Sequence, residues 1–301
     1  MRGIAVGVDA GGSATTASYS RDGVFRQAIT GDGASASALG AEEAARRIVV
    51  TIQELLAGDT PAVIFVGAAG AGRRAVAQAM ESAILAHFPQ TRIRVADDAQ
   101  IALRASVTSG PGMVLVAGTG SIAYAENAAG QSFRAGGYGY LLGDDGSGFA
   151  IGLAAAKFLA RVYDGRAIAD ELSRDVEARL NVEGQSGLFD AVYGVARPVP
   201  VIASLARSVL ALAGNGVRSA QKIVQGAGLE LAELVKVAAK KADLANTACP
   251  LILAGGLLNE NSMLSFLLET RLQADLPSAQ ILKRVAEPHR GALSAAEAVL
   301  A

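Results

Sequence analysis

Short apolar runs bounded by glycine and acidic residues recur along the first third of the chain. The pattern predicts a β-meander with strands over 4–8, 15–20 and 24–29, a tight turn at Gly11-Gly12 and a hairpin turn at Asp22-Gly23. Apolar residues at helical spacing then alternate with short buried runs. They predict helices over 41–57, 73–88 and 100–107, and strands over 62–66 and 93–95.

The same succession of strand, glycine turn, strand and turn begins again in the middle of the chain. A strand over 113–117 is followed by a glycine turn at 118–121 and by two further strands over 122–126 and 131–135. Ser13 and Ser121 are 108 residues apart, and the turn glycines Gly23 and Gly130 are 107 apart. Because corresponding positions of the two glycine hairpins are separated by nearly the same number of residues, they indicate an internal duplication.

The remainder of the second half is mostly helical. The pattern predicts helices over 148–163, 167–180, 200–213, 218–242 and 291–301, and a strand over 251–254. Strands that alternate with helices predict an α/β protein with a largely parallel inner sheet in each half. We therefore expect two domains, 1–108 and 109–288, with a hinge at 108–111. The C-terminal helix, 289–301, is expected to return to the first domain.

Composition excludes several classes of protein. A length of 301 residues fits about two domains, and 51 % apolar with 18 % charged residues is ordinary for a globular protein. A net charge of −1 without a Lys/Arg stripe argues against nucleic-acid binding. Cys249 is the single cysteine, and His87 and His289 lack metal-ligand spacing. Without a targeting segment or an apolar run of ~18 residues, we expect a cytoplasmic protein that binds no membrane.

The first glycine turn follows a strand that ends in a carboxylate. Asp9 is followed by Gly11, Gly12 and Ser13. Backbone N–H groups without a nearby Cβ can form a nest for phosphate oxygens. A carboxylate at the end of a strand can hold Mg²⁺, usually through water. The alternative is a plain hairpin in which the glycines serve only the geometry.

The second glycine turn has the same place after its strand and adds two hydroxyl groups. It consists of Gly118, Thr119, Gly120 and Ser121. Phosphoryl transfer depends on positioning and on spreading negative charge, so donors that converge from two domains suit this chemistry. The pair of loops therefore predicts phosphate binding more strongly than either loop alone.

Two further segments carry acidic groups. Asp97 and Asp98 lie at the end of a strand and the start of a helix. Asp97 can cap that helix, and Asp98 can orient a hydroxyl group and accept its proton. The run from Gly136 to Gly148 holds six glycines in thirteen positions, which predicts a shaped functional loop. The alternative is a flexible connector with Asp145 as a helix cap.

Taken together and in this order, the motifs resemble those of the BadF/BadG/BcrA/BcrD-type ATPase and N-acetylglucosamine kinase family, within the actin/hexokinase superfamily. The resemblance covers nearly the whole chain. It implies two duplicated ribonuclease H-like, actin-type ATPase domains with a cleft between them. It also implies ATP and Mg²⁺ as cofactors, a small-molecule sugar as substrate and a homodimer. The implied reaction is ATP-dependent phosphorylation of a hydroxyl of an amino sugar such as N-acetylglucosamine or glucosamine.

The resemblance also assigns roles to residues of this chain. Gly11, Gly12 and Ser13 resemble the first phosphate motif, and Thr119, Gly120 and Ser121 the second, while Gly255 and Gly256 resemble the adenosine motif. Asp9 is the implied Mg²⁺ residue and Asp98 the implied catalytic base. The implied sugar-binding residues are Ser35, Gly137, Tyr138 and Asp144.

The sequence departs from the family pattern in five places. Ala10, Ser13 and Ala14 stand where the first motif usually has a glycine, a threonine and a lysine. Tyr138 stands where tryptophan is common. Ser35 stands where the sugar kinases carry an asparagine that contacts the acetamido sugar. Because a serine hydroxyl cannot offer the donor and acceptor of an amide, the identity of the sugar stays open.

Three other functions compete with the kinase. Gly67 and the segment 70–75 fit a dinucleotide-binding fingerprint after a strand and before a helix. An NAD(P) oxidoreductase would leave both glycine hairpins unexplained. A regulatory, activator-type ATPase of this family would need cysteines for an iron–sulfur cluster, and one per subunit is too few. The third is a sugar-sensing protein without transfer activity. The sequence lacks a Walker A lysine motif.

Overall fold

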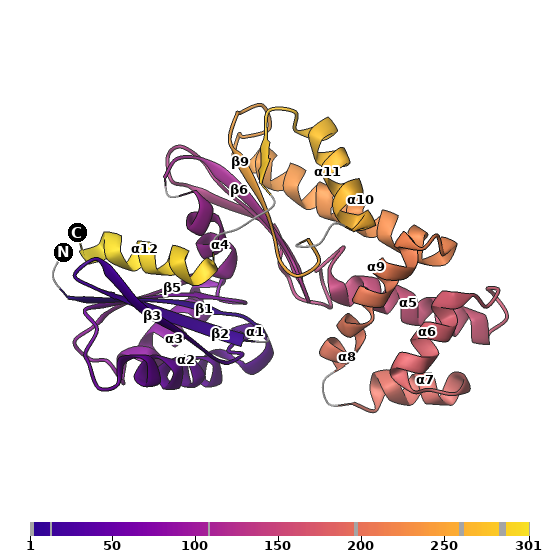
Figure 1. Ribbon diagram of the computed structural model, residues 1–301, viewed down its shortest axis with the longest axis horizontal. Coiled ribbons are helices and arrows are strands. Elements are labelled where there is room, and N and C mark those ends of the chain that lie inside the picture. Colours follow the sequence, from indigo (N-terminus) through magenta and orange to yellow (C-terminus); the bar gives the residue numbers. More distant parts are fainter. Residues whose placement is uncertain are drawn as a thin grey trace. The chain divides into compact units, whose positions relative to one another are not determined.

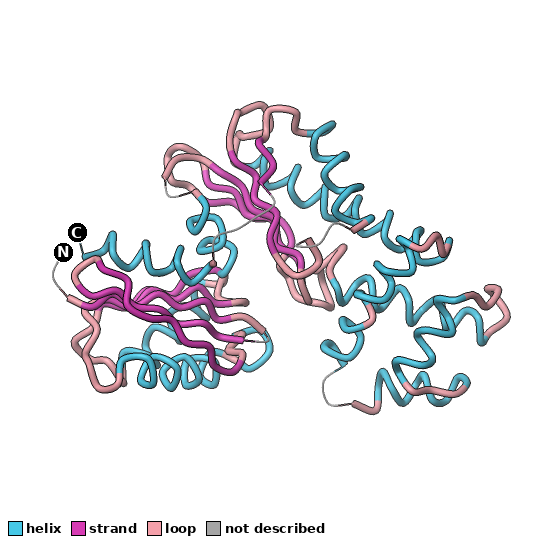
Figure 2. Tube along the Cα trace, in the orientation of Figure 1, coloured by secondary structure: helices cyan, strands magenta, loops and turns pink. Residues whose placement is uncertain are grey.

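The computed structural model describes residues 3–12, 14–107, 109–195, 198–258, 262–282 and 287–300. The chain divides into two units: unit 1 comprises residues 1–112 and 285–301, and unit 2 comprises residues 113–284. Figure 1 labels the elements of each unit, and Figure 2 shows one group of strands with flanking helices in each.

Unit 1 contains a mixed five-stranded sheet. Its strands are β1 (Ile4–Ala10), β2 (Ala14–Arg21), β3 (Val24–Asp32), β4 (Val63–Ala68) and β5 (Arg92–Asp97), in the order β3-β2-β1-β4-β5. The β1–β2 and β2–β3 pairs are antiparallel, and β4 and β5 continue the sheet in parallel. Asp22 and Gly23 have φ values of 55° and 77°, as a two-residue hairpin turn with both central residues at positive φ requires.

Helices cover both faces of this sheet (Figure 1). They are α1 (Ala36–Leu39), α2 (Ala41–Leu56), α3 (Arg74–Leu85), α4 (Asp98–Ser106) and α12 (Pro288–Leu300). The C-terminal helix α12 crosses β1 at Gly7, where a Cβ would lie 2.1 Å from the backbone nitrogen of Leu293. It meets α4 at Gly291, whose Cβ would lie 2.3 Å from the carbonyl oxygen of Ile101. Glycines at both crossings let the backbones approach closely.

The sheet of unit 2 repeats the strand order of unit 1. Its strands are β6 (Gly112–Ala117), β7 (Ser121–Glu126), β8 (Ser132–Gly136), β9 (Pro250–Ala254) and β10 (Gln280–Leu282), in the order β10-β9-β6-β7-β8. β7 and β8 are antiparallel, whereas β9 is parallel to both β6 and β10. The predicted α/β fold with two duplicated domains is therefore confirmed.

The helices of unit 2 are α5 (Gly148–Tyr163), α6 (Glu171–Leu180), α7 (Gly184–Tyr193), α8 (Pro198–Ser204), α9 (Ala206–Gly214), α10 (Arg218–Lys241) and α11 (Met263–Asp275). The predicted single helix over 200–213 was wrong, because the chain forms two helices that meet at Leu205. α6 starts later than predicted, because the Asp170 side chain accepts hydrogen bonds from Leu172 and Ser173 and caps it.

Four short or irregular elements were missed, namely α1, α7, α11 and β10. In α11 the pattern is ambiguous, since Leu264 and Leu268 are buried while Phe266 is 70 % exposed.

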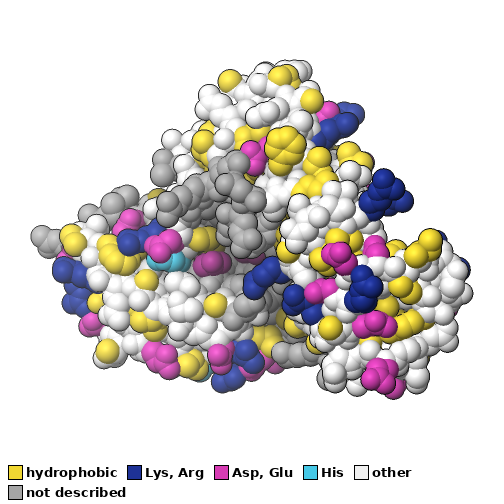
Figure 3. Space-filling model, turned by 45° about the vertical axis from the view of Figure 1, so that its right-hand side comes forward, with side chains coloured by type: hydrophobic (Ala, Val, Ile, Leu, Met, Phe, Trp, Pro, Cys, Tyr) yellow, Lys and Arg dark blue, Asp and Glu magenta, His cyan; other side chains and the backbone are white. Residues whose placement is uncertain are grey.

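Among the described residues, no single helix has the length and apolarity of a membrane span. One pair of helices, 198–214 with 218–241, has that length and apolarity when the two are taken together, but the pair is bent by 113°. On the face drawn in Figure 3, acidic and basic side chains are interspersed.

Candidate functional site

The parallel strands of unit 1 bring two acidic positions to the same edge of the sheet. Asp9 lies near the end of β1 and pairs with Gly67 of β4, while Ala68 of β4 pairs with Asp97 at the end of β5. Asp98 follows directly and begins α4. Since neighbouring strands lie about 4.8 Å apart, β1 and β5 are separated by about 10 Å at this edge. The carboxylates of Asp9 and Asp98 therefore belong to the same edge of the sheet.

Asp9 is a carboxylate that lacks a compensating charge. Burial raises its pKa from 3.8 to about 6, because removal from water disfavours the charged form. Within the described residues, no cationic side chain forms an ion pair with it. A divalent cation would supply the missing charge, so the environment of Asp9 fits a hard, oxygen-binding ion such as Mg²⁺. In the described parts of the chain, no group of three or more His, Cys, Asp or Glu side chains is arranged to hold a metal ion by itself.

Asp97 and Asp98 converge on a single backbone amide. The Oδ1 atoms of both accept a hydrogen bond from the nitrogen of Ala99, each at 3.0 Å. Asp97 is thereby the N-cap of α4. Burial, followed by the negative charges of Asp97 and Asp9, raises the pKa of Asp98 well above its ordinary value. Asp98 is therefore a carboxylate with raised basicity at the edge of the sheet.

The first glycine loop is fixed by backbone hydrogen bonds to its own unit. The Gly11 nitrogen donates to the Ala14 carbonyl at 3.0 Å, and the Gly11 carbonyl accepts from the Ala34 nitrogen at 3.0 Å. The Ala69 nitrogen donates to the Ala10 carbonyl, also at 3.0 Å. The predicted phosphate residue Ser13 lies outside the described residues. The loop is thus tied to two segments that the sequence places far away.

Ser35, predicted to bind sugar, has its hydroxyl group engaged inside unit 1. The residue is only 4 % exposed. Its Oγ lies 2.8 Å from the Oγ of Ser37 and donates to the Ala69 carbonyl at 3.4 Å. Gly70 lies against the same segment, since a Cβ there would come within 2.6 Å of the Ser37 nitrogen. The Ser35 hydroxyl is therefore held by contacts within unit 1.

The second glycine loop is held by the N-terminus of α5. The carbonyl of Gly118 accepts from the Gly148 nitrogen at 2.7 Å, and the carbonyl of Thr119 accepts from the Phe149 nitrogen at 3.2 Å. The amides of Thr119 and Gly120 have no hydrogen-bond partner in the part of the chain that the structure describes. With the carbonyls engaged by the helix, these amides are available for phosphate oxygens.

Asp144 lies directly against this loop. Its Oδ1 accepts from the Ser121 nitrogen at 3.3 Å, and a Cβ on Gly120 would come within 2.9 Å of its Oδ2. Asp144 has a φ of 58°, an uncommon conformation for a side-chain-bearing residue. Burial is the main cause of its raised pKa, with a contribution from the charge of Asp145. The geometry couples the predicted sugar residue Asp144 to the phosphate loop.

Two other predicted sugar residues begin the same glycine-rich run. Gly137 has a φ of 70°, and a Cβ there would come within 2.8 Å of the Ile122 side chain. Its nitrogen donates to the Ser121 carbonyl at 3.0 Å. Tyr138 is 63 % exposed, and the Arg134 guanidinium lies 5.6 Å from its ring centroid. The exposed ring is available as a contact surface, while the positive φ of Gly137 and its contact with the Ile122 side chain favour glycine at that position.

The two glycines of the predicted adenosine motif differ in their surroundings. Gly255 has a φ of 97°, and a Cβ would come within 2.3 Å of the Ala117 carbonyl oxygen. The Leu257 nitrogen donates to that same oxygen at 3.1 Å. A Cβ on Gly256 would meet nothing within 4 Å. Gly255 thus joins the end of β9 to the start of the second glycine loop, whereas Gly256 leaves open space beside the backbone.

Two glycines of the dinucleotide-binding fingerprint have packing roles. A Cβ on Gly67 would come within 2.4 Å of the Ile101 side chain on α4. Gly70 packs against Ser37, as described above. Contacts between neighbouring elements of unit 1 therefore explain both glycines without a pyrophosphate.

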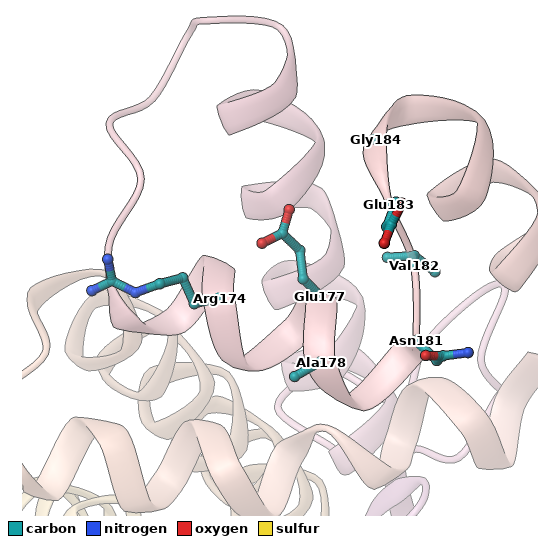
Figure 4. Close-up of a pocket in the computed structure, with 7 residues that line it drawn as sticks. All are labelled: Arg174, Glu177, Ala178, Asn181, Val182, Glu183 and Gly184. Carbon is teal, nitrogen blue, oxygen red and sulfur yellow. The ribbon is translucent and has the colours of Figure 1, made fainter.

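A separate pocket of about 710 Å³ lies in the helical part of unit 2. Glu177 projects from α6, Glu183 lies on the segment that leads into α7, and Arg174 points away from both (Figure 4). The Tyr163 hydroxyl donates to Glu177 at 2.7 Å, which links α5 to α6. The lining residues are Arg174, Glu177, Ala178, Asn181, Val182, Glu183 and Gly184. None of the predicted site residues lines this pocket.

Two α/β units with the same strand order, each with a glycine loop after its first strand, define an actin-type ATPase fold. The chain belongs to the BadF/BadG/BcrA/BcrD ATPase family, which it matches over residues 6–299.

Its relatives include the N-acetylmuramic acid/N-acetylglucosamine kinase of Clostridium acetobutylicum, 31 % identical over 219 residues, which are 73 % of this chain and 72 % of the relative. The N-acetyl-D-glucosamine kinase of Dictyostelium discoideum is 30 % identical over 200 residues, or 65 % of this chain and 62 % of the relative.

Solved structures show the same fold. A protein from Chromobacterium violaceum proposed to be an N-acetylglucosamine kinase has a TM-score of 0.79 and 25 % identity, with 97 % of this chain and 98 % of that chain covered. A ROK family glucokinase from Streptomyces griseus has a TM-score of 0.61 and 15 % identity, with 98 % and 99 % covered.

Proposed function

We propose that this chain is an ATP-dependent kinase that transfers the γ-phosphoryl group of ATP to a hydroxyl of an amino sugar. The observation that carries the proposal is the acidic edge of unit 1. Asp9, the first glycine loop and Asp98 lie at the carboxyl ends of parallel strands, where α/β proteins bind ligands. Family membership and the names of the sugar-kinase relatives support the same activity.

In this proposal Asp98 orients the acceptor hydroxyl and takes its proton during attack on phosphorus. A general base works best when its pKa approaches the working pH, and the raised pKa of Asp98 moves it in that direction. The free amides of Thr119 and Gly120 would bind phosphate oxygens. Fixed donors of this kind stabilise charge that spreads over the transferred group.

Mg²⁺ would be held by Asp9, largely through water, together with phosphate oxygens of ATP. It would neutralise negative charge on the phosphates. Ala14 stands where relatives of the family usually carry a lysine, so the Asp9 site would contribute more of the phosphate positioning in this chain. Adenosine would pack against the backbone at Gly256.

The acceptor would contact Asp144, Gly137 and Tyr138. Ser35 is buried and its hydroxyl is hydrogen-bonded to Ser37, so it would not make the contact that an asparagine amide makes with the sugar in the related kinases. The proposal names the amino-sugar class and leaves the choice among its members to experiment.

A coupled assay of ADP release with a panel of acceptors tests the activity. The panel comprises glucosamine, N-acetylglucosamine, N-acetylmuramic acid, N-acetylmannosamine and glucose. Amino sugars should stimulate release well above the rate with ATP alone. Release that no acceptor stimulates would contradict the kinase and favour a regulatory ATPase or a sugar-sensing protein.

The Asp98→Asn variant tests the mechanism. It should bind ATP and sugar normally and lose turnover by a factor of about 10²–10⁴, as expected for loss of a general base. Asp97→Asn is the matched control, because asparagine also caps helices well and the substitution removes a neighbouring carboxylate. Undiminished turnover of Asp98→Asn, or an equal loss in both variants, would refute the role of Asp98.

A further inference from the structure

A row of polar side chains on α2 is linked by hydrogen bonds. Glu43, Arg47 and Thr51 are four residues apart, so they follow one another along one face of the helix. The Nε atom of Arg47 donates to Glu43 Oε1 at 2.9 Å, and Thr51 Oγ1 donates to the Arg47 carbonyl at 3.1 Å. Because the Arg47 side chain is only 31 % exposed and is paired with Glu43, its guanidinium has a fixed direction.

This face of α2 lies against the end of β3 and the segment that follows it. A Cβ on Gly31 would come within 2.7 Å of Thr51 Oγ1, and Arg47 Nη1 donates to the Gly33 carbonyl at 2.9 Å. Gly33 is buried, and a buried carbonyl needs a hydrogen-bond partner. Among the described residues, Arg47 is the one side chain of another element that hydrogen-bonds to the backbone of 33–37.

The segment that Arg47 holds is bonded in turn to the first glycine loop. The Ala34 nitrogen donates to the Gly11 carbonyl at 3.0 Å, and the Ala36 nitrogen donates to the Ala69 carbonyl at 2.9 Å. Ala34 and Ala36 are both buried. The donor that fixes Gly11 therefore belongs to the residue next to the carbonyl that Arg47 fixes.

The Gly11 carbonyl determines where the following N–H group points. It shares a planar peptide unit with the Gly12 N–H, and the described chain contains no cis peptide bond, so the two groups point in opposite directions. The Gly12 N–H has no acceptor in the part of the chain that the structure describes, and a Cβ on Gly12 would meet nothing within 4 Å. The hydrogen bond from Ala34 thus directs an unpaired amide away from Ala34 and into open space.

We infer that Arg47 is a positioning residue of the first glycine loop: it holds the Gly33 carbonyl, and through Ala34 it fixes the direction in which Gly12 presents its N–H to a phosphate oxygen. Glycine-rich backbone has wide conformational freedom, and donors stabilise phosphate charge best when they are fixed in advance. Arg47 acts through protein groups, an inference that rests on the proposed function because it takes this loop to bind the phosphates of ATP.

Calorimetric titration with MgATP alone tests the role of Arg47. Arg47→Met keeps an apolar chain of similar length and removes the donor, so it should raise the Kd by about ten-fold, the lower end of what one hydrogen bond to a charged group contributes. Arg46→Met is the matched control, because Arg46 also binds Glu43, at 2.7 and 2.8 Å, but donates to no carbonyl of 33–37. Its Kd should equal that of the wild type. Arg47→Lys should restore most of the affinity, since an ammonium group is still a donor for the Gly33 carbonyl.

Hydrogen exchange without nucleotide measures the positioning itself. Backbone amides exchange faster when the hydrogen bonds that hold them open more often. The segment 31–37 should exchange faster in Arg47→Met than in the wild type, and at the wild-type rate in Arg46→Met. The strand β6 of unit 2 is the internal reference and should exchange equally in all three proteins.

The possible outcomes separate this role from the proposed activity. A wild-type chain that does not bind MgATP would contradict the proposed function and the role of Arg47 together. Wild-type binding with equal affinity in Arg47→Met and Arg46→Met would overturn the role of Arg47 alone. An Arg47→Lys variant that binds no better than Arg47→Met, or unchanged exchange of 31–37 in Arg47→Met, would overturn it as well.

Discussion

Replacing Asp9 with asparagine should separate the stability of unit 1 from its chemistry. The folded pKa of Asp9, about 6, lies above its ordinary value of 3.8 because of burial. The folded state therefore binds the proton more tightly than the unfolded state does. Ionisation of Asp9 as the pH rises from about 4 to above 6 subtracts from the free energy of unfolding. Asparagine has nearly the same shape and carries no charge to be buried.

The pKa difference sets the size of the effect. At 1.36 kcal/mol per pKa unit, a rise from 3.8 to about 6 corresponds to about 3 kcal/mol. Because Asp9 is only partly buried, solvent screening reduces the expected gain to about 1–3 kcal/mol. Asp9→Asn should therefore be more stable than the wild type by about that amount at pH 7.5, while losing kinase activity.

Urea unfolding at several pH values is the assay. The advantage of Asp9→Asn should be full at pH 7.5 and should shrink towards zero below about pH 3, where the wild-type carboxyl is protonated in both states. Asp190→Asn, at an exposed position of α7, is the control and should change little. MgATP should raise the melting temperature of the wild type more than that of Asp9→Asn. A variant no more stable than the wild type at pH 7.5, or a gain independent of pH, would refute the reasoning.

Three glycine substitutions test the close contacts. Gly120→Ala places a Cβ 2.9 Å from Asp144 Oδ2 and should lower turnover at least ten-fold. Its circular dichroism spectrum should be unchanged. Normal turnover would show that this contact is unimportant. Gly255→Ala combines a φ of 97° with a Cβ 2.3 Å from the Ala117 carbonyl, so it should cost about 2–3 kcal/mol in urea unfolding and raise the KM for ATP. Gly7→Ala forces α12 from β1 and should destabilise unit 1 by about 3 kcal/mol, visible as faster amide exchange in α12; wild-type exchange would contradict this.

The duplication could be predicted because its signals are local. A strand, a glycine turn and a second strand are each specified by neighbouring residues, and the Asp22-Gly23 turn requires only the conformation of those two residues. Asp9 and Asp98 could be singled out for the same reason, since each follows an apolar strand. The rule that parallel strands end at one edge then places both carboxylates together.

Local patterns were less informative where packing decides the outcome. The break between α8 and α9 lies three residues after a close contact between α8 and α5, since a Cβ on Gly152 of α5 would lie 1.9 Å from the Ile202 carbonyl. In α11 an exposed Phe266 lies between buried leucines, so burial depends on its neighbour α10 and not on helical periodicity alone.

The sequence by itself determined the α/β class, the repeat, the two glycine loops and the acidic groups beside the first. Only the tertiary structure showed that the Ser35 hydroxyl donates to the Ala69 carbonyl and that Gly255 serves a backbone contact with Ala117. Both facts depend on atoms contributed by segments far apart in the chain. Such contacts follow from the packing of whole elements, which no short stretch of sequence specifies.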